Sequence, residues 1–96
     1  MHPDYYEAII QVRPRKESVL DFIRAEALRT KAQISREISK DFGFDVYLSS
    51  RKIALQIGKK LKKQFNGTLK VSKTLHSRDR QSSKLLYRLT VLFKLK

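Results

Sequence analysis

Cysteine is absent from this 96-residue sequence, and its absence excludes several kinds of chemistry. A chain without cysteine has no disulfide bond, no thiolate nucleophile and no cysteine-based zinc site. This composition is compatible with a reducing compartment, and we expect a cytoplasmic protein. Hydrophobic residues make up 41% of the chain, which indicates a folded domain rather than a disordered one. We expect residues 1–96 to form one domain, because chains of this length rarely divide into two cores.

Long apolar runs and leader segments are also missing. No stretch approaches the ~18–20 apolar residues that a membrane span requires. The first six residues, Met-His-Pro-Asp-Tyr-Tyr, have neither the basic lead nor the apolar core of a signal peptide. We therefore expect no membrane partner.

Catalytic and cofactor-binding motifs are missing too. The sequence has no phosphate-binding loop, no dinucleotide fingerprint and no nucleophile elbow. Glu7, Asp45 and Asp79 occur singly, and His2 and His76 lack the neighbours that would complete a metal site. We expect a protein that is not an enzyme, with no catalytic residues, cofactor, metal or small-molecule substrate.

Acidic residues are nearly absent from the second half of the chain, whose net charge is +13. Residues 1–45 contain eight Lys or Arg and eight Asp or Glu, whereas residues 46–96 contain fourteen Lys or Arg and a single acid, Asp79. The whole positive excess therefore lies after residue 45. This uneven distribution of positive charge predicts a dedicated surface for a polyanion such as RNA.

The hydrophobic pattern predicts a strand followed by a helix at the start. Tyr5–Arg13 alternates like a half-buried strand, with Tyr6 on the core side, and Pro14 ends it. A helix should begin at about Lys16, since Leu20, Ile23 and Ala27 follow at helical spacing.

The next segment, residues 33–40, is ambiguous. Ile34 and Ile38 fit a helix at i and i+4, and they fit a strand with polar residues between them equally well. We favour a hairpin, in which a turn at residues 41–43 leads into a strand at 44–48. A two-turn helix remains the alternative.

A second helix is predicted after Ser49 or Ser50, either of which is a natural N-cap. Its buried stripe comprises Ile53, Ala54, Ile57, Leu61 and Phe65, and Asn66-Gly67 supplies a stop signal. Strands should follow at residues 69–75 and 87–95, joined by the polar loop His76–Lys84. We expect that loop to be poorly ordered in the free domain and to become ordered on RNA, because it has no large apolar side chain to offset the cost of ordering.

The basic residues of the second half form the candidate binding surface. Five cations of the second helix project away from its apolar stripe, and no acid between Val46 and Arg78 could pair with them. Leu55 projects from the same side. The alternative interpretation is that these cations form an ordinary solvated face of the helix and bind nothing. We predict contacts to RNA phosphates from Arg51, Lys52, Lys59, Lys62, Lys63, Lys73, Arg78, Arg80, Lys84 and Arg88. The tyrosines and phenylalanines are expected mostly in the core, and only secondarily as stacking platforms for bases.

Two stretches resemble a known family. Residues 43–54, from Gly-Phe-Asp-Val-Tyr to Arg-Lys-Ile-Ala, and residues 78–91, from Arg-Asp-Arg-Gln to Tyr-Arg-Leu-Thr-Val, resemble the nonsense-mediated decay protein three family. These proteins are adaptors for nuclear export of the large ribosomal subunit, and they have archaeal relatives. The resemblance implies binding to the large subunit, and it implies that residues 33–41 are strand. The Cys-x-x-Cys pairs and export signals of the family are missing. The chain is therefore expected to be either a central domain of a larger adaptor or a stand-alone, archaeal-type relative.

These observations predict an α/β (α+β) fold in two layers. A mixed, largely antiparallel sheet of four or five strands should pack one face against two helices. The predicted function is non-enzymatic binding of ribosomal RNA on the large ribosomal subunit, in ribosome biogenesis. In the alternative, the basic face contacts acidic ribosomal or assembly proteins.

Overall fold

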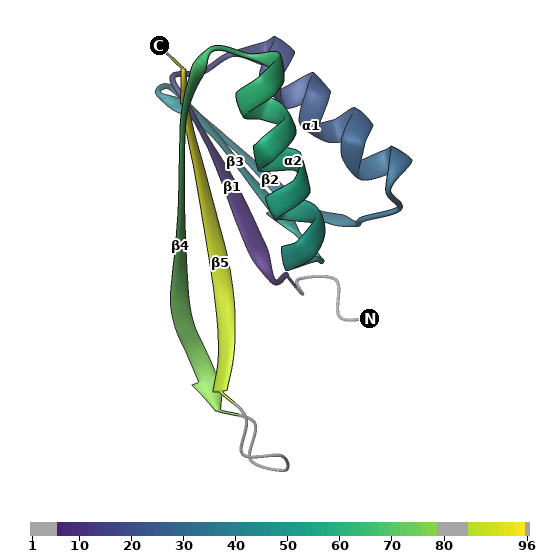
Figure 1. The fold of residues 1–96 in the computed structure, drawn as a ribbon, viewed down its shortest axis with the longest axis vertical. Coiled ribbons are helices and arrows are strands. Elements are labelled where there is room, and N and C mark those ends of the chain that lie inside the picture. Colours follow the sequence, from purple (N-terminus) through teal and green to yellow (C-terminus); the bar gives the residue numbers. More distant parts are fainter. Residues whose placement is uncertain (1–5, 79–84, 96) are drawn as a thin grey trace.

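Seven elements follow one another along the chain in the computed structural model, which describes residues 6–78 and 85–95 (Figure 1). The side chains of residues 75–78 and 85–86 are not part of this description. The elements are β1 (Ala8–Arg13), α1 (Glu17–Arg29), β2 (Ile34–Lys40), β3 (Gly43–Leu48), α2 (Arg51–Gln64), β4 (Gly67–Arg78) and β5 (Leu85–Leu95).

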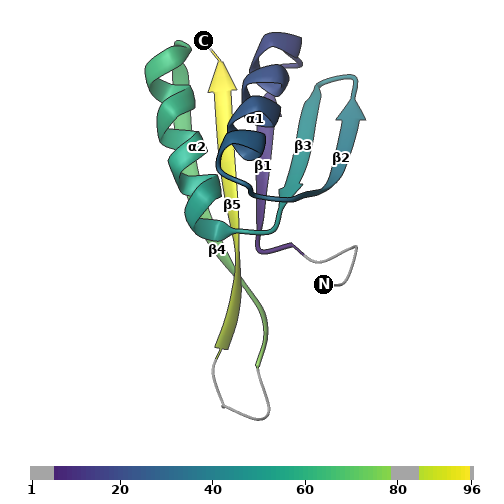
Figure 2. The ribbon, with the colours of Figure 1, turned by 90° about the vertical axis from the view of Figure 1, so that its right-hand side faces the viewer.

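The five strands form one open sheet in the order β2-β3-β1-β5-β4 (Figure 2). The central strand, β1, pairs antiparallel with β3 and parallel with β5. The two outer pairs, β2 with β3 and β4 with β5, are antiparallel hairpins. The sheet is therefore mixed and largely antiparallel, as the sequence predicted.

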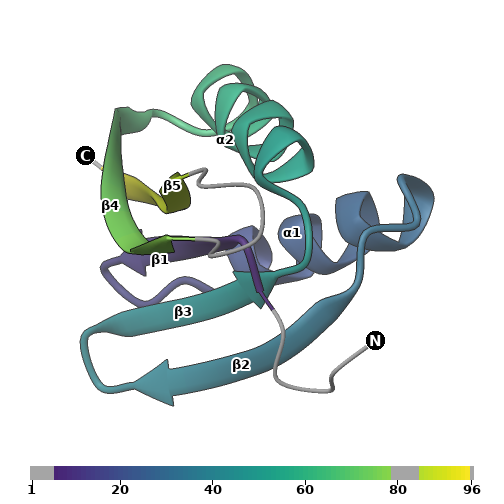
Figure 3. The same cartoon turned by 90° about the horizontal axis from the view of Figure 1, so that it is seen from below.

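Both helices cover the same face of this sheet, which leaves the opposite face uncovered by any helix (Figure 3). Side chains alternate along a strand, so every second residue of β1, β3 and β5 enters the layer beneath the helices. The buried core consists of Ala8, Ile10, Val12, Val19, Leu20, Ile23, Ala27, Phe44, Val46, Leu48, Ala54, Ile57, Leu61, Leu89, Val91 and Phe93. The two-layer sandwich with both helices on one face is thus confirmed.

The ambiguous segment is a strand, so the predicted hairpin is confirmed and the two-turn helix is wrong. β2 pairs with β3 from Ile34 opposite Leu48 to Lys40 opposite Gly43, with a shift of register between Ile34 and Arg36. β2 is an edge strand, so this pairing bonds its backbone along one side, and Ile34 packs against the core.

α2 begins where the sequence predicted and ends for a different reason. The Ser50 hydroxyl accepts a hydrogen bond from the Ile53 amide at 3.3 Å, which makes Ser50 the N-cap. At the other end Phe65 already has extended backbone, and Gly67 has no positive φ. A Cβ on Gly67 would lie 2.5 Å from the carbonyl oxygen of Lys94. Gly67 therefore allows β4 to approach β5 closely. The helix ends just before the predicted stop signal Asn66-Gly67, without a glycine in the left-handed region.

The first strand differs from its prediction. β1 starts at Ala8, because the chain bends at Glu7. The bend takes the Tyr6 ring to the uncovered face, where it meets Tyr47 edge-on with ring centroids 4.7 Å apart. The prediction of Tyr6 on the core side was therefore wrong. The other tyrosine with a described side chain, Tyr87, is 39% exposed, so the expectation of buried aromatics holds for Phe44 and Phe93 but not for Tyr6 or Tyr87.

The strand β4 is also longer than predicted. It continues through Arg78, pairing Ser77 with Leu86 and Arg78 with Leu85, so residues 76–78 are strand and not loop. Strand pairing depends on the backbone, and a stretch without apolar alternation can still pair. The remainder of the predicted loop, residues 79–84, lies outside the described residues, as does its expected ordering on RNA.

Candidate nucleic-acid interface

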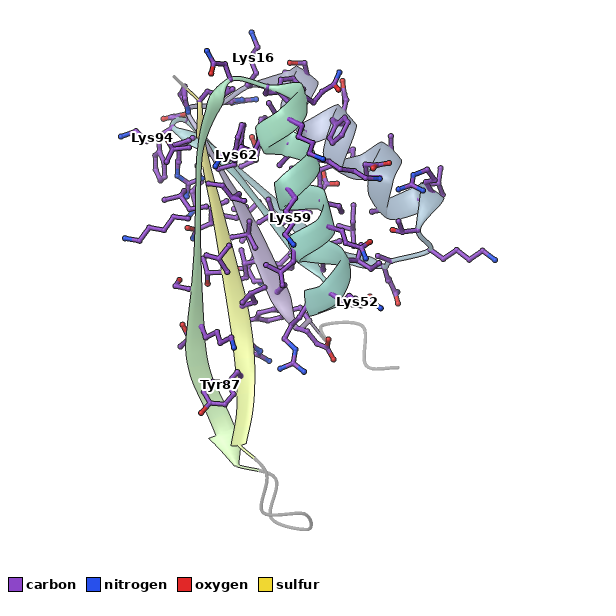
Figure 4. All side chains as sticks on the ribbon, in the orientation of Figure 1. Lys16, Lys52, Lys59, Lys62, Tyr87 and Lys94 are labelled. Carbon is purple, nitrogen blue, oxygen red and sulfur yellow. The ribbon has the colours of Figure 1, made fainter. Side chains whose placement is uncertain are left out.

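The outward side of α2 carries the predicted cations. The helix buries Ala54, Ile57, Gly58 and Leu61 against the sheet, which fixes its rotation. Residues on the opposite side then face solvent, and all five predicted cations of the helix are exposed: Arg51, Lys52, Lys59, Lys62 and Lys63. Figure 4 shows Lys52, Lys59 and Lys62 spread along the length of α2.

Charges on the other helix are neutralised by nearby partners. Arg24 of α1 bonds Glu37 of β2 with its Nη2 atom 2.6 Å from Oε1, and Arg29 bonds Glu26 at 2.7 Å. Glu26 also accepts from Lys60 of α2 at 2.5 Å. The hydrogen bond from Arg29, followed by that from Lys60, lowers the pKa of Glu26 from 4.5 to about 2. The acids of the first half therefore compensate nearby cations.

The lysines on the outward side of α2 have no such compensation. None of Lys52, Lys59, Lys62 and Lys63 forms an ion pair with any residue in the part of the chain that the structure describes. Solvated lysines near one another repel, and this cost is relieved when a polyanion binds. We call this set of four residues the α2 lysine face.

Arg51 stands at the N-terminal end of this face and is held in place. Its backbone amide donates to the Glu7 carboxylate at 3.2 Å, and its Nη1 atom donates to the carbonyl oxygen of Tyr87 at 3.1 Å. Glu7 thus places a negative charge at the N-terminus of α2, where the helix dipole favours it. Arg51 therefore joins the start of α2 to β5.

A hollow of about 220 Å³ lies beside this junction. It is lined by Arg51 and Leu55 of α2, Lys73 of β4, and Tyr87, Arg88 and Leu89 of β5. Leu55, which the sequence places on the basic side of the helix, is half-buried and packs against the core from this position. The helical spacing of Leu55 and Arg51 signalled their proximity, whereas nothing in the sequence signalled Tyr87 as their neighbour.

Arg88 belongs to a different environment from the other predicted residues. Its guanidinium lies 3.8 Å from the centroid of the Tyr6 ring, and it donates a hydrogen bond to the Tyr6 hydroxyl at 2.9 Å. Since Leu89 is buried beneath the helices, the side chain of Arg88 points to the uncovered face of the sheet. The structure therefore brings Arg51, Lys73 and the α2 lysine face to one side of the sheet and directs the Arg88 guanidinium to the other.

The remaining predicted residues cannot be placed as a site. Arg78 lies in β4, with only its backbone described, and Arg80 and Lys84 lie outside the described residues.

The uncovered face carries cations that the sequence reasoning did not select. Arg13 and Lys40 each lie 2.9 Å from one oxygen of Asp45, which is only 4% exposed, so two cations share one carboxylate. Lys70 and Lys94 are exposed on the same face, as their alternation with core residues could have indicated.

Two other features are absent from the described residues. Within residues 6–78 and 85–95, no three His, Cys, Asp or Glu side chains cluster closely enough to hold a metal ion. Over the same described residues, no helix has the length and apolar character needed to cross a membrane.

Comparison with known proteins identifies a family for nearly the whole chain. A family model described as NMD3, second domain, matches residues 5–95. The match includes both helices and all five strands. A comparison with curated protein sequences gives no match.

Proposed function

This chain belongs to the NMD3 family of ribosomal-subunit export adaptors, and we propose on that basis that it binds ribosomal RNA of the large subunit through the α2 lysine face. Membership implies a ribosome-related function, in a family that is not a known enzyme family. The RNA contact and its position on α2 are our proposal. We place this binding in the cytoplasm.

One observation carries the proposal. Lys52, Lys59, Lys62 and Lys63 lie exposed on one side of one helix, and none has an acidic partner among the described residues. An RNA backbone presents phosphates in a regular row, and each phosphate contacted by a lysine releases condensed counterions. Several unpaired lysines along one side of a helix therefore suit a row of phosphates better than they suit a protein surface that carries charges of both signs.

The test is a charge reversal on the helix. The triple variant Lys59→Glu/Lys62→Glu/Lys63→Glu leaves the core intact, because all three side chains are exposed. At about 0.1 M salt each lost phosphate contact weakens binding by a little under tenfold, so the triple variant should bind large-subunit RNA fragments roughly 100-fold or more weakly than the parent. Fluorescence anisotropy titrations over a range of salt concentrations measure both the affinity and the salt slope.

A matched control distinguishes a local contact from the effect of total charge. Lys16→Glu/Lys31→Glu/Arg36→Glu changes the net charge equally at exposed positions outside α2. We expect it to retain most of the affinity. Equal losses in the two triple variants would contradict a site on α2. RNA binding that is absent in the parent, with binding to ribosomal proteins instead, would favour the protein-interaction alternative.

A further inference from the structure

The hollow beside the start of α2 exists because the sheet is longer than the helix that covers it. The ribbon formed by β4 and β5 runs on past the N-terminal end of α2, as Figure 1 shows. At that end the helix side of the ribbon loses its cover, so Tyr87 is 39% exposed although Leu89, two residues along the same side, is buried. The result is an apolar recess at the edge of the core, open to solvent.

The recess has an apolar floor and a basic rim. Leu55, Tyr87 and Leu89 supply the apolar surface, while Arg51 and Lys73 approach it from α2 and β4. No acid is among the residues that line the recess, and Glu7 is bonded to Arg51 at its rim. An occupant that suits these walls has a flat apolar part and carries negative charge beside it.

The recess is also continuous with the α2 lysine face. Residues three and four apart share one side of a helix, so Leu55 has Arg51, Lys52 and Lys59 as its helical neighbours. A chain of phosphates that follows these lysines would pass directly over the recess. Its volume of about 220 Å³ lies below the ~300 Å³ at which pockets for drug-sized ligands begin. This size suits one planar ring system and not a whole cofactor.

We propose that this recess takes a single unpaired RNA base, which stacks on Tyr87 and packs against Leu55 while Arg51 and Lys73 contact the flanking phosphates. The proposal rests on the proposed function, since it requires that the α2 lysine face binds RNA. The recess adds a preference for unpaired over paired nucleotides, which phosphate contacts alone do not produce. Phosphates position a nucleic acid without distinguishing paired from unpaired nucleotides, whereas a stacking pocket selects a base that has left its helix.

An apolar side chain of a partner protein fits the recess less well. A peptide seated there would need an acid beside its apolar residue to pair with Lys73, which has no ion pair among the described residues, whereas every RNA nucleotide carries that charge by its chemistry. The basic rim therefore favours a nucleotide.

Three RNA probes test the parent protein without any substitution. They are a fully paired duplex, the same duplex with one bulged adenosine, and the same duplex with an abasic bulge. A base stacked on an aromatic side chain strengthens binding by about 5- to 150-fold. We expect the bulged adenosine to bind more tightly than the other two by a factor in this range. Equal binding of the adenosine and abasic bulges would overturn the pocket and leave the RNA-binding proposal standing.

Substitutions at Tyr87 then locate the preference. Tyr87→Ala should lose the preference for the bulged adenosine while binding the paired duplex as the parent does, and Tyr87→Phe, which keeps the ring, should retain the preference. Tyr87→Ala that keeps the preference, or that weakens all three probes equally, would contradict stacking at this position. A parent protein that binds none of the probes, at low or moderate salt, defeats the proposed function itself.

Discussion

Lys31 adopts a backbone conformation that a lysine rarely takes. Its φ is +61°, in the left-handed region, directly after α1 ends at Arg29 with Thr30 as its C-cap. The reversal lets the Ala32 amide donate to the carbonyl oxygen of Ala27 at 2.9 Å, which closes the last turn. A side chain in this region brings Cβ close to the backbone, so the hydrogen bond forms at a conformational cost that glycine would not incur.

Replacing this lysine with glycine should stabilise the domain. Lys31→Gly removes the strain, and we expect the free energy of unfolding to rise by about 1 kcal/mol, less the extra entropy of glycine in the unfolded chain. Urea denaturation measures the change, and Lys31→Ala, which keeps a Cβ, is the control. A Lys31→Gly variant no more stable than Lys31→Ala would show that the conformation costs nothing.

Sequence patterns predicted what depends on near neighbours and missed what depends on distant ones. The Ser50 cap, the buried stripe of α2 and the exposure of its lysines all arise within a few residues, so local spacing was sufficient. The position of Tyr6 depends on Arg88, 82 residues later, and on Tyr47. The recess needs Tyr87 of β5 beside Leu55 of α2, and the sheet order that places them together was not readable from the sequence.

At the scale of elements, ion pairs attach α1 to its neighbours. Glu26 of α1 forms an ion pair with Lys60 of α2, and Arg24 of α1 forms one with Glu37 of β2. The hydrogen bond from Arg24 also lowers the pKa of Glu37. The pKa of Glu26 falls to about 2 when its partners are in place. A carboxylate whose pKa is lower in the folded state adds stability above its unfolded pKa and loses that contribution as the pH falls towards its folded pKa.

This linkage predicts the pH range in which Glu26 contributes to the stability of the folded state. Glu26→Gln should lower the melting temperature at pH 7, and its deficit relative to the parent should begin to shrink below about pH 4.5 and nearly disappear by about pH 2. Thermal melts at a series of pH values measure it. Asp41→Asn, which removes one exposed acid without a described ion pair, is the control and should differ little from the parent at any of these pH values. A deficit for Glu26→Gln that stays constant down to pH 2 would show that packing, not charge, stabilises this contact.

At the scale of the whole molecule, cations lie on both faces of the sheet, and only some of them are paired. On the uncovered face Arg13 and Lys40 share Asp45 and Arg88 stacks on Tyr6, whereas Lys70 and Lys94 have no ion pair among the described residues. On the helix side, the α2 lysine face has no acidic partner among the described residues. The molecule measures 43 × 24 × 23 Å, so its two shorter dimensions span about three Debye lengths at physiological salt, where this length is about 8 Å. RNA bound over α2 should therefore be nearly insensitive to charges on the far face under these conditions.

The RNA affinities of two charge-reversal variants, measured at two salt concentrations, test this expectation. Two double variants, Lys59→Glu/Lys62→Glu on α2 and Lys70→Glu/Lys94→Glu on the uncovered face, change the net charge equally at exposed positions. At about 0.15 M salt we expect the α2 variant to lose at least tenfold in RNA affinity and the far-face variant less than about threefold. At about 0.01 M salt the Debye length grows to about 30 Å and exceeds the thickness of the domain, so the penalty of the far-face variant should rise towards that of the α2 variant. If RNA instead lies on the uncovered face, the order at physiological salt is reversed, with Lys70→Glu/Lys94→Glu the weaker binder.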